Sequence, residues 1–283
     1  MILNNLKHAI LFSCLIAGIL CLPLPTLQSA SLTEAFDTPV DGIPAGWTLR
    51  LSGSVDNTNG NTVGIKEINP ETGNALRFYR GGGSGAIYYT SPLGESSDGK
   101  MSDFSAEIII RPSGSTSAFA VNSSAGFVVR AQSLSYNNFN GYYIAISMGT
   151  GEGNGRIGIY ENPIGHNHSS ASGTLHAYDT FSTSLLNNTD YKLEMSAVGS
   201  VITASLWTLG ATPIELASAT YLSANTTAGY FGLRNGFGNT NQAVYMRNLY
   251  LEQTIPEPSA VLLIFTGFIG LLSMRRYSHS QAL

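Results

Sequence analysis

The sequence predicts an all-β fold, an antiparallel jelly-roll sandwich with an apolar helix at each end of the chain. Short runs of alternating apolar and polar residues recur across residues 31–254, as in strands with one face in a core. Gly, Asn, Ser and Pro separate these runs, and such residues favour turns. No helical period of useful length interrupts them. About a dozen short strands joined by turns are typical of a sandwich or jelly roll.

The composition fits an extracellular β-rich protein. Charged residues make up 11% of the 283 residues, against roughly 25% in ordinary soluble proteins. The chain has 31 Gly and 14 Tyr but only 2 Trp, and its formal net charge is −4. This profile argues against a helical bundle or a coiled coil. The mild acidity and the lack of a basic run exclude nucleic acid as an expected partner.

The N-terminal residues 1–30 have the features of a signal peptide. Lys7 supplies a basic start, and the apolar stretch 9–22 has the length of a signal-peptide core. Pro23 follows, and the small residues before and at Ala30 predict cleavage there. The alternative is an uncleaved membrane anchor. Both cysteines lie in this segment, so a processed chain would contain neither disulfides nor reactive thiols.

The C-terminal residues 255–283 form a second three-part pattern. A Pro-Glu-Pro tripeptide precedes an apolar segment, 260–274, and two arginines close that segment. Fifteen residues of helix reach about 22 Å, less than the roughly 30 Å of bilayer hydrocarbon, but long arginines can lengthen the effective span. We therefore expect a transmembrane helix over 260–274, with the arginines on the cytoplasmic side. The alternative is an apolar helix packed on the domain. The signal residues are Pro256, Glu257, Pro258, Arg275 and Arg276.

This order of tripeptide, apolar helix and arginines at a chain end resembles the PEP-CTERM sorting signal. The resemblance covers about the last 28 residues of the sequence. It implies recognition by the export machinery and by an exosortase, a membrane protease that cuts near the Pro-Glu-Pro. It also implies a Gram-negative bacterium that makes exopolysaccharide. The protein is expected to be anchored transiently in the membrane and then to reach the cell surface or the extracellular matrix.

Residues 31–254 are expected to form one domain, because no long linker or clear repeat divides them. In 191–198, four apolar residues alternate with polar ones, which indicates a half-buried strand. Gly199-Ser200 separates this run from the next, and a two-residue loop with Gly first predicts a type II′ hairpin. The predicted strands are 75–80, 85–90, 104–111, 126–132, 142–148, 156–161, 191–198, 201–208, 215–221, 229–234 and 243–252.

Several motifs of this domain resemble concanavalin A-like or LamG-type jelly rolls. They cover nearly the whole domain: Phe36-Asp37, Pro44-Ala45-Gly46-Trp47, Gly126-Phe127-Val128-Val129-Arg130, Gly141-Tyr142-Tyr143, Tyr191-Lys192-Leu193-Glu194, the turn at Gly199, Gly229-Tyr230-Phe231-Gly232-Leu233-Arg234, and the last strand through Tyr245 and Leu249. The superfamily contains lectins, adhesion modules and glycoside hydrolases, including a keto-disaccharide hydrolase family. The resemblance implies the fold and leaves the activity open.

The carboxylates do not form the strand motif of a retaining glycosidase. Such enzymes need two carboxylates about 5 Å apart, and laminarinase-like members of the superfamily carry them on one strand. Glu107 and Glu194 each stand alone in their predicted strands. We expect both on the surface, although carboxylates from different strands could still converge.

Two further motifs are expected to be structural. His166 and His168 form His-x-His, with His176 eight residues on, but the surrounding polar residues indicate solvated loop histidines rather than zinc ligands. The glycine-rich segment 81–85 lacks the Lys-Ser/Thr of a phosphate-binding loop and precedes a strand. It is expected to be a plain loop. No metal or cofactor is assigned, and calcium is left open because LamG-like folds can hold it.

Two loops have the residues that a sugar needs. Sugars offer an apolar face and many hydroxyls, so a binding loop should pair exposed aromatic rings with amide side chains. Trp47 and Trp207 are expected in the core instead. The candidate ligand-binding residues are Tyr136, Asn137, Asn138 and Tyr142 in one loop and Asn235, Phe237 and Asn239 in the other.

These features predict an exported, exosortase-sorted surface or matrix protein that binds polysaccharide without catalysis. No catalytic residues are assigned. The alternatives are a carbohydrate-active hydrolase on the same fold and a purely structural matrix protein.

Overall fold

The structure is a computed structural model of the full chain. The chain divides into two units, and the first, Met1–Gln28 with Pro256–Leu283, lies outside the described residues. The second unit, Ser29–Ile255, contains every strand reported below. The described residues are 29–36, 43–51, 63–69, 73–79, 85–93, 97–114, 123–136, 138–148, 155–162, 173–236 and 242–254.

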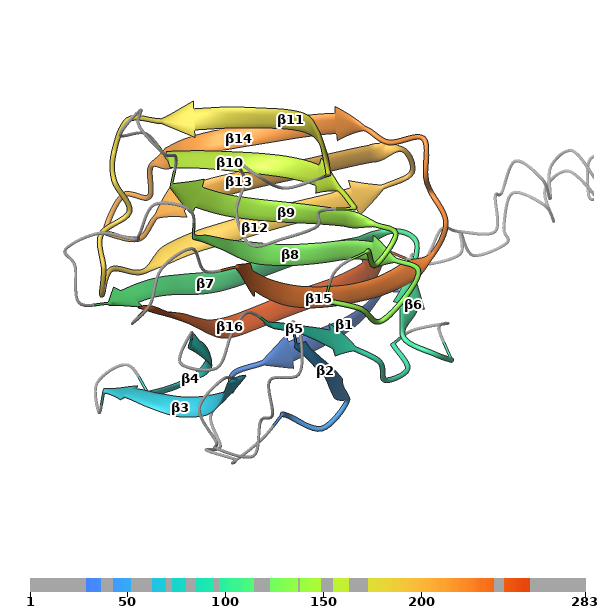
Figure 1. Ribbon diagram of the computed structural model, residues 1–283, viewed down its shortest axis with the longest axis horizontal. Coiled ribbons are helices and arrows are strands. Elements are labelled where there is room, and N and C mark those ends of the chain that lie inside the picture. The colour runs from blue at the N-terminus through green and yellow to red at the C-terminus, as the bar shows by residue number, and fades with distance from the viewer. Residues whose placement is uncertain are drawn as a thin grey trace, which may run out of the picture. The chain divides into compact units, whose positions relative to one another are not determined.

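Two eight-stranded antiparallel sheets make up this unit (Figure 1). Sheet A has the order β14-β13-β12-β7-β16-β4-β3, and β1 also pairs with β16. Its strands are β14 (Glu215–Leu222), β13 (Val201–Thr208), β12 (Tyr191–Val198), β7 (Phe104–Gly114), β16 (Gln242–Thr254), β4 (Gly73–Tyr79), β3 (Val63–Asn69) and β1 (Ser29–Glu34).

Sheet B has the order β11-β10-β9-β8-β15-β5-β2, and β6 also pairs with β15. Neighbours far apart in sequence, such as β8 and β15, require long connections, as in a jelly roll. Its strands are β11 (Thr174–Phe181), β10 (Gly155–Glu161), β9 (Tyr142–Met148), β8 (Ser124–Ala131), β15 (Gly229–Gly236), β5 (Gly85–Tyr89), β2 (Trp47–Leu51) and β6 (Lys100–Met101).

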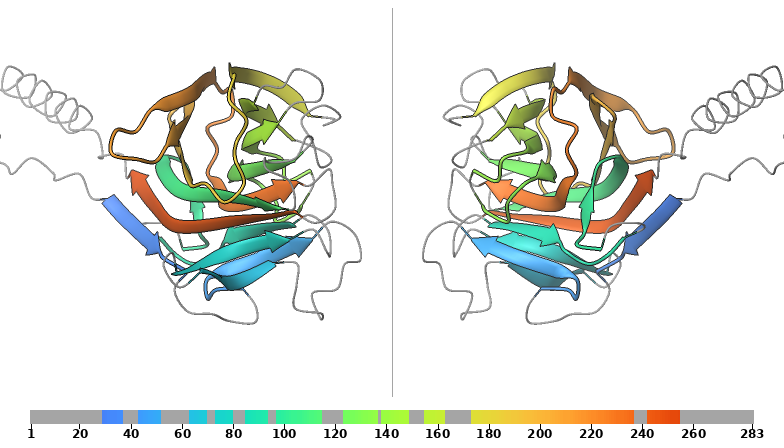
Figure 2. Two further views of the ribbon diagram at one scale, coloured as in Figure 1. Left: turned by 90° about the vertical axis from the view of Figure 1, so that its left-hand side faces the viewer. Right: turned by 90° about the vertical axis from the view of Figure 1, so that its right-hand side faces the viewer.

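The main core lies between the two sheets, which Figure 2 shows edge-on. Phe231 is fully buried at its centre, with its ring centroid 5.8 Å from that of Phe104 and 5.6 Å from that of Phe127. Trp47 joins the same group, 6.4 Å from Phe231. Burying each such ring contributes roughly 1.5–3 kcal/mol, and tilted or edge-on ring contacts add to this.

The structure confirms the all-β antiparallel sandwich and the strongly alternating strands. β12 follows the predicted burial alternation from Tyr191 to Ala197. Val198 pairs with Val201, and Gly199 has a φ of 54°, which confirms the tight turn. The sequence did not predict five strands: β1, β2, β3, β6 and β11.

Both tryptophans were predicted to lie in the core, and the structure confirms this for one of them. Trp47 lies in the core as predicted, with 8% exposure. Trp207 does not, because it is half-buried on the side of β13 opposite the core residues Leu206 and Ala204. Its ring lies 5.9 Å from the Lys192 ammonium group.

Residues 1–28 of the predicted signal peptide, the sorting-signal residues 256–258 and 275–276 and the segment 260–274 lie outside the described residues. The last two residues of the predicted signal peptide, Ser29 and Ala30, are the first residues of β1 and pair with Thr254 and Gln253. None of the described segments is a helix of the length and apolarity that crossing a bilayer requires.

Candidate functional site

The loop 132–141 does not expose its aromatic rings, so that part of the sugar-loop prediction is wrong. Tyr136 is 3% exposed and Phe139 is fully buried. The Tyr136 hydroxyl lies within hydrogen-bond distance of the Asn235 carbonyl oxygen, at 3.3 Å. The physical reason is that this loop folds down on sheet B and uses its rings to cover the sheet.

The other residues of the first predicted site are separated from one another. Tyr142 is 2% exposed and belongs to the main core between the sheets. Its hydroxyl is hydrogen-bonded to the Ser223 hydroxyl at 2.6 Å. Asn138 is exposed and has a φ of 55°, a left-handed conformation that Asn tolerates. Asn137 lies outside the described residues.

Of the three candidate residues in the second predicted loop, Asn235 alone is among the described residues, and it is fully buried. Its Oδ1 atom accepts a hydrogen bond from the Gly85 amide at 3.0 Å, which ties β15 to the start of β5. Phe237 and Asn239 lie outside the described residues, as do His166, His168 and residues 81–84 of the glycine-rich segment.

A second apolar cluster covers the outer face of sheet B, the face turned away from sheet A. Tyr143 and Tyr160 project from this face, since Ile144 and Ile159 beside them point into the main core. Small residues lie beside the two tyrosines, and a Cβ atom at Gly158 would come within 2.7 Å of the Tyr160 ring. The small residues therefore make room for rings that lie along the sheet. The cluster contains Ala86, Tyr88, Val128, Ala131, Tyr136, Phe139, Tyr143, Ala145 and Tyr160.

A buried arginine organises this outer cluster. The Arg234 guanidinium lies 4.5 Å from the Tyr136 ring centroid and 4.6 Å from that of Tyr143, distances at which a cation is attracted to an aromatic face. Burial raises the pKa of Tyr143 to about 12, and the Arg234 charge opposes that rise. Burial also raises the pKa of Tyr88. The neutral forms of these tyrosines are therefore favoured in the folded protein.

At the edge of the same face, one aromatic ring is open to solvent. Tyr178 on β11 is 56% exposed. The Arg156 guanidinium, on the neighbouring strand β10, lies 4.6 Å from its ring centroid. Thr180 is exposed and is paired with Arg156 across the two strands. We call Arg156, Tyr178 and Thr180 the Tyr178 platform. It combines an accessible ring, a cation that braces the ring and a hydroxyl on one face of the sheet.

His176 is not a loop residue, contrary to the expectation from sequence. It lies in β11 at a register shift, where Ala177 pairs with Ile159 and Leu175 pairs with Tyr160. Such a β-bulge re-aims the extra side chain. The His176 Nε2 atom lies 2.7 Å from the Glu161 carboxylate, and its ring stacks on Tyr221 of β14 at 4.1 Å. The stacking on Tyr221 joins edge strand β11 of sheet B to edge strand β14 of sheet A, which meet in Figure 2, while the contact with Glu161 is to the neighbouring strand β10.

Two glutamates on different strands lie opposite one another. Glu107 on β7 is the direct cross-strand partner of Glu194 on β12, on the outer face of sheet A. Cβ atoms of directly opposed residues lie about 4.5–5.5 Å apart. Glu107 is exposed, and Glu194 forms an ion pair with Lys192. Both are on the surface as predicted, while their pairing depends on a strand register that the sequence alone does not show.

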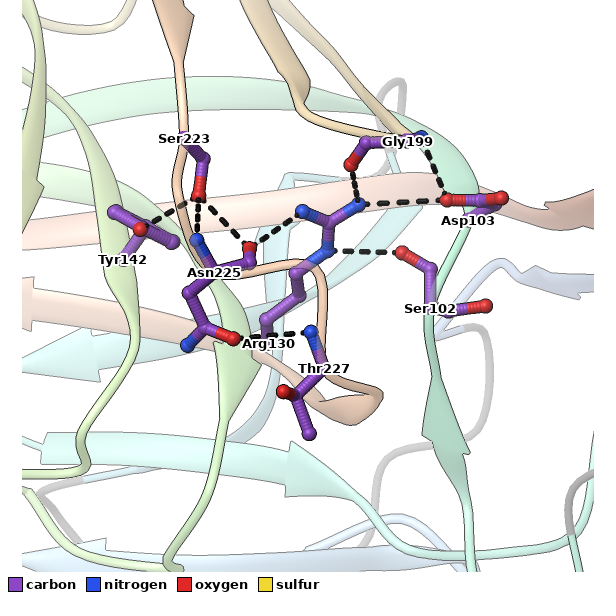
Figure 3. A network of polar contacts seen from close by, with 8 residues as sticks. All are labelled: Ser102, Asp103, Arg130, Tyr142, Gly199, Ser223, Asn225 and Thr227. Carbon is purple, nitrogen blue, oxygen red and sulfur yellow. Dashed lines mark hydrogen bonds and ion pairs between the residues drawn. The ribbon is translucent and has the colours of Figure 1, made fainter.

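The end of the sandwich is held together by Arg130, which is fully buried (Figure 3). Its guanidinium donates to the carbonyl oxygens of Ser102, Asn225 and Gly199 at 2.9, 2.9 and 2.7 Å. Asp103 lies 3.4 Å away as its counter-ion. One side chain of sheet B thus joins the β12–β13 turn, the β14–β15 connection and the start of β7. Burial lowers the pKa of Arg130, and Asp103 opposes this.

Metal binding has no candidate in the part of the chain that the structure describes. No three His, Cys, Asp or Glu side chains come together there in a way that could hold a metal ion. His176 and Glu161 are a pair only.

Comparison with known proteins supports the fold and identifies no family. No family model matches the chain, and no curated protein matches it. Among solved structures, the exoplasmic/lumenal domain of VIP36 in its Ca²⁺/Man3GlcNAc-bound form has a TM-score of 0.50 at 15% identity, over 81% of this chain and 90% of that one. The carbohydrate-binding module CBM66 from Bacillus subtilis has a TM-score of 0.43 at 15% identity, over 74% and 96%.

The likeness to the VIP36 domain shows the fold alone. It agrees with the predicted jelly roll of the lectin-like kind, with two antiparallel sheets packed face to face. A fold of this kind hosts several functions, so the function must be argued from the site.

Proposed function

We propose that the domain binds polysaccharide through the Tyr178 platform, without catalysis. The observation that carries the proposal is the 56% exposed Tyr178 ring on sheet B, braced by Arg156 at 4.6 Å. An accessible aromatic ring offers a flat apolar surface to the face of a sugar, while Arg156 and Thr180 offer hydrogen bonds to its hydroxyls. The bracing cation limits the motion of the ring, which lowers the entropy lost on binding.

Two further observations support a carbohydrate ligand. The VIP36 domain of similar fold was solved with Man3GlcNAc, which makes a glycan ligand the natural first candidate on this scaffold. The sequence resemblance to a PEP-CTERM signal implies an exopolysaccharide-producing cell. We further propose that the protein is exported, anchored transiently by 260–274 and sorted by an exosortase to the surface or matrix.

The test is a glycan array run beside a hydrolysis screen with the full chain. We expect the protein to be retained on at least one polysaccharide and to release no reducing ends. Tyr178→Ala should abolish retention, whereas Tyr250→Ala should not, because Tyr250 is a half-buried tyrosine of sheet A. Repeating the array in the presence of a calcium chelator decides whether calcium takes part in binding. Phe237→Ala, in the second predicted loop, tests whether that loop extends the contact.

A hydrolase remains a second candidate because Glu107 and Glu194 face each other across β7 and β12. A retaining glycosidase needs two carboxyl groups about 5 Å apart, and side chains whose Cβ atoms lie about 4.5–5.5 Å apart can bring their carboxyl groups to such a separation. Reducing-end release that Glu107→Gln abolishes would favour this candidate over pure binding. If the protein shows neither retention on a glycan nor release of reducing ends, the result favours a structural matrix protein without a specific ligand.

A further inference from the structure

Three apolar side chains are exposed side by side at one end of sheet A. Val198, Val201 and Leu222 are 45%, 39% and 71% exposed. Val198 pairs with Val201, and Val201 pairs with Leu222, so the three residues occupy neighbouring positions on β12, β13 and β14. Side chains directly opposite one another in adjacent strands touch. We call these three residues the apolar corner.

The apolar corner is held in place by the surrounding backbone. The Gly199 carbonyl oxygen accepts a hydrogen bond from Arg130 at 2.7 Å, and its amide donates to Asp103 Oδ1 at 2.8 Å. The Ser200 carbonyl oxygen accepts from the Ser223 amide at 2.7 Å. Because these hydrogen bonds fix the backbone of the turn, the neighbouring apolar side chains are held pointing into solvent in the folded protein.

The same end of the sheet carries both ends of the domain. The Thr254 amide donates to the Asp103 carbonyl oxygen at 2.9 Å, and Asp103 also accepts from the Gly199 amide. Ser29 is the cross-strand partner of Thr254. Asp103 therefore links the β12–β13 turn to the point where β16 ends, and β1 begins beside it.

An apolar stretch of sequence lies beyond each of these two points. The segment 260–274 follows Thr254 after five residues, and the stretch 9–22 precedes Ser29. Six residue steps span at most about 21 Å. A segment 260–274 that enters a bilayer must therefore hold the Thr254 end of the sandwich close to the lipid surface.

We propose that the apolar corner is a lipid-contacting surface, which rests on the bilayer interface while 260–274 is inserted. This proposal is independent of carbohydrate binding and depends on the expected insertion of 260–274. Single exposed apolar residues are common on protein surfaces, whereas these three lie next to one another at the end of the sheet that precedes 260–274. Burying these three side chains in the interface adds to the anchoring of a single short segment. It also fixes which end of the sandwich faces the membrane.

The experiment places a fluorescent label in the full chain reconstituted in phosphatidylcholine vesicles. Cys14→Ser and Cys21→Ser remove both native cysteines, and Leu222→Cys carries an environment-sensitive dye. The matched control is Ile214→Cys, which is 61% exposed and lies just before β14, at the opposite end of that strand from Leu222. Vesicles with and without nitroxide-labelled lipid report contact. A thermal melt confirms that each labelled variant is folded.

The proposal predicts that the label at 222 loses about half its emission to nitroxide lipid, because interfacial side chains lie roughly 5–10 Å into the headgroup boundary. The label at 214 should be unaffected. Equal quenching at both positions, or none at 222 when the protein floats with the vesicles, would overturn the proposal. Failure to float would overturn it together with the expected insertion. Emission changes at 222 without nitroxide dependence would indicate a second copy of the chain instead.

Discussion

Arg130 of sheet B donates a hydrogen bond to the carbonyl oxygen of Gly199 in the sheet A hairpin, at 2.7 Å. This bond links the two layers at the end where the chain enters and leaves the domain. Arg130 has a left-handed φ of 53°, so the backbone there is strained to aim the side chain. The network of Figure 3 compensates for that strain with hydrogen bonds to three separate segments.

Replacing Arg130 should be among the most destabilising changes in the domain. Arg130→Met removes three hydrogen bonds to carbonyl oxygens, of which, among the described residues, only that of Asn225 keeps another donor, the Ser223 hydroxyl, and it leaves Asp103 without its counter-ion. Removing one partner of a buried ion pair costs roughly 3–5 kcal/mol. Denaturant unfolding of Arg50→Met is the control, because Arg50 is exposed and donates to the carbonyl oxygens of Leu134 and Leu49. Equal losses in the two variants would contradict the account.

Gly126 should not tolerate a methyl group. A Cβ atom there would lie 1.9 Å from the Ile144 carbonyl oxygen, so Gly126→Ala must displace backbone between β8 and β9. Overpacking of this kind costs typically about 1–3 kcal/mol. Gly210→Ala is the matched control, since its Cβ would meet no atom within 4 Å. A thermal melt should show a clear fall for the first variant and almost none for the second.

Stability should fall at alkaline pH through Tyr143. Its pKa is raised from 10.0 to about 12 in the folded protein, so above pH 10 the unfolded chain releases a proton that the folded chain retains. The stabilisation from this group, roughly 3 kcal/mol at about 1.4 kcal/mol per pKa unit, is present below pH 10 and lost as pH rises to about 12. Tyr143→Phe should show a shallower decline in chemical unfolding between these pH values. An identical decline would exclude Tyr143 as the cause.

His176 should matter for stability, and Tyr178 on the same strand should not. His176→Ala removes the stacking on Tyr221 and the bond to Glu161, contacts worth about 0.5–1.5 kcal/mol each. Tyr178→Ala removes an exposed ring, and surface changes usually stay within about 0.5 kcal/mol. Urea unfolding of both variants checks this. A large loss for Tyr178→Ala would mean that the ring has a structural role.

The sequence predicted the strands whose pattern is local and missed features that depend on tertiary structure. β12 alternates strictly because one face is in the core and the other in water. β11 is an edge strand with mostly exposed or half-exposed residues, so it has no such alternation and His176 was expected in a loop. β1 and β3 were missed although β3 places Val63 and Ile65 in the core.

The prediction of the two binding loops also failed where it depended on tertiary structure. Tyr136 and Asn235 have the residue types of a sugar site, but a sequence does not show that the 132–141 loop folds over Arg234. The sequence does not single out Tyr178, because its exposure and its contact with Arg156 follow from the pairing of β10 with β11. The Glu107–Glu194 pair is likewise a consequence of strand register.

The most direct test of the central claim is a calorimetric titration of the protein with the glycan that the array selects. The account predicts that Tyr178→Ala weakens binding at least about tenfold, since truncating a key contact residue typically costs more than 1 kcal/mol. Tyr178→Phe, which keeps the ring, should bind nearly as tightly as the wild type. Equal affinity for the wild type and Tyr178→Ala would contradict the assignment of the Tyr178 platform as the binding site.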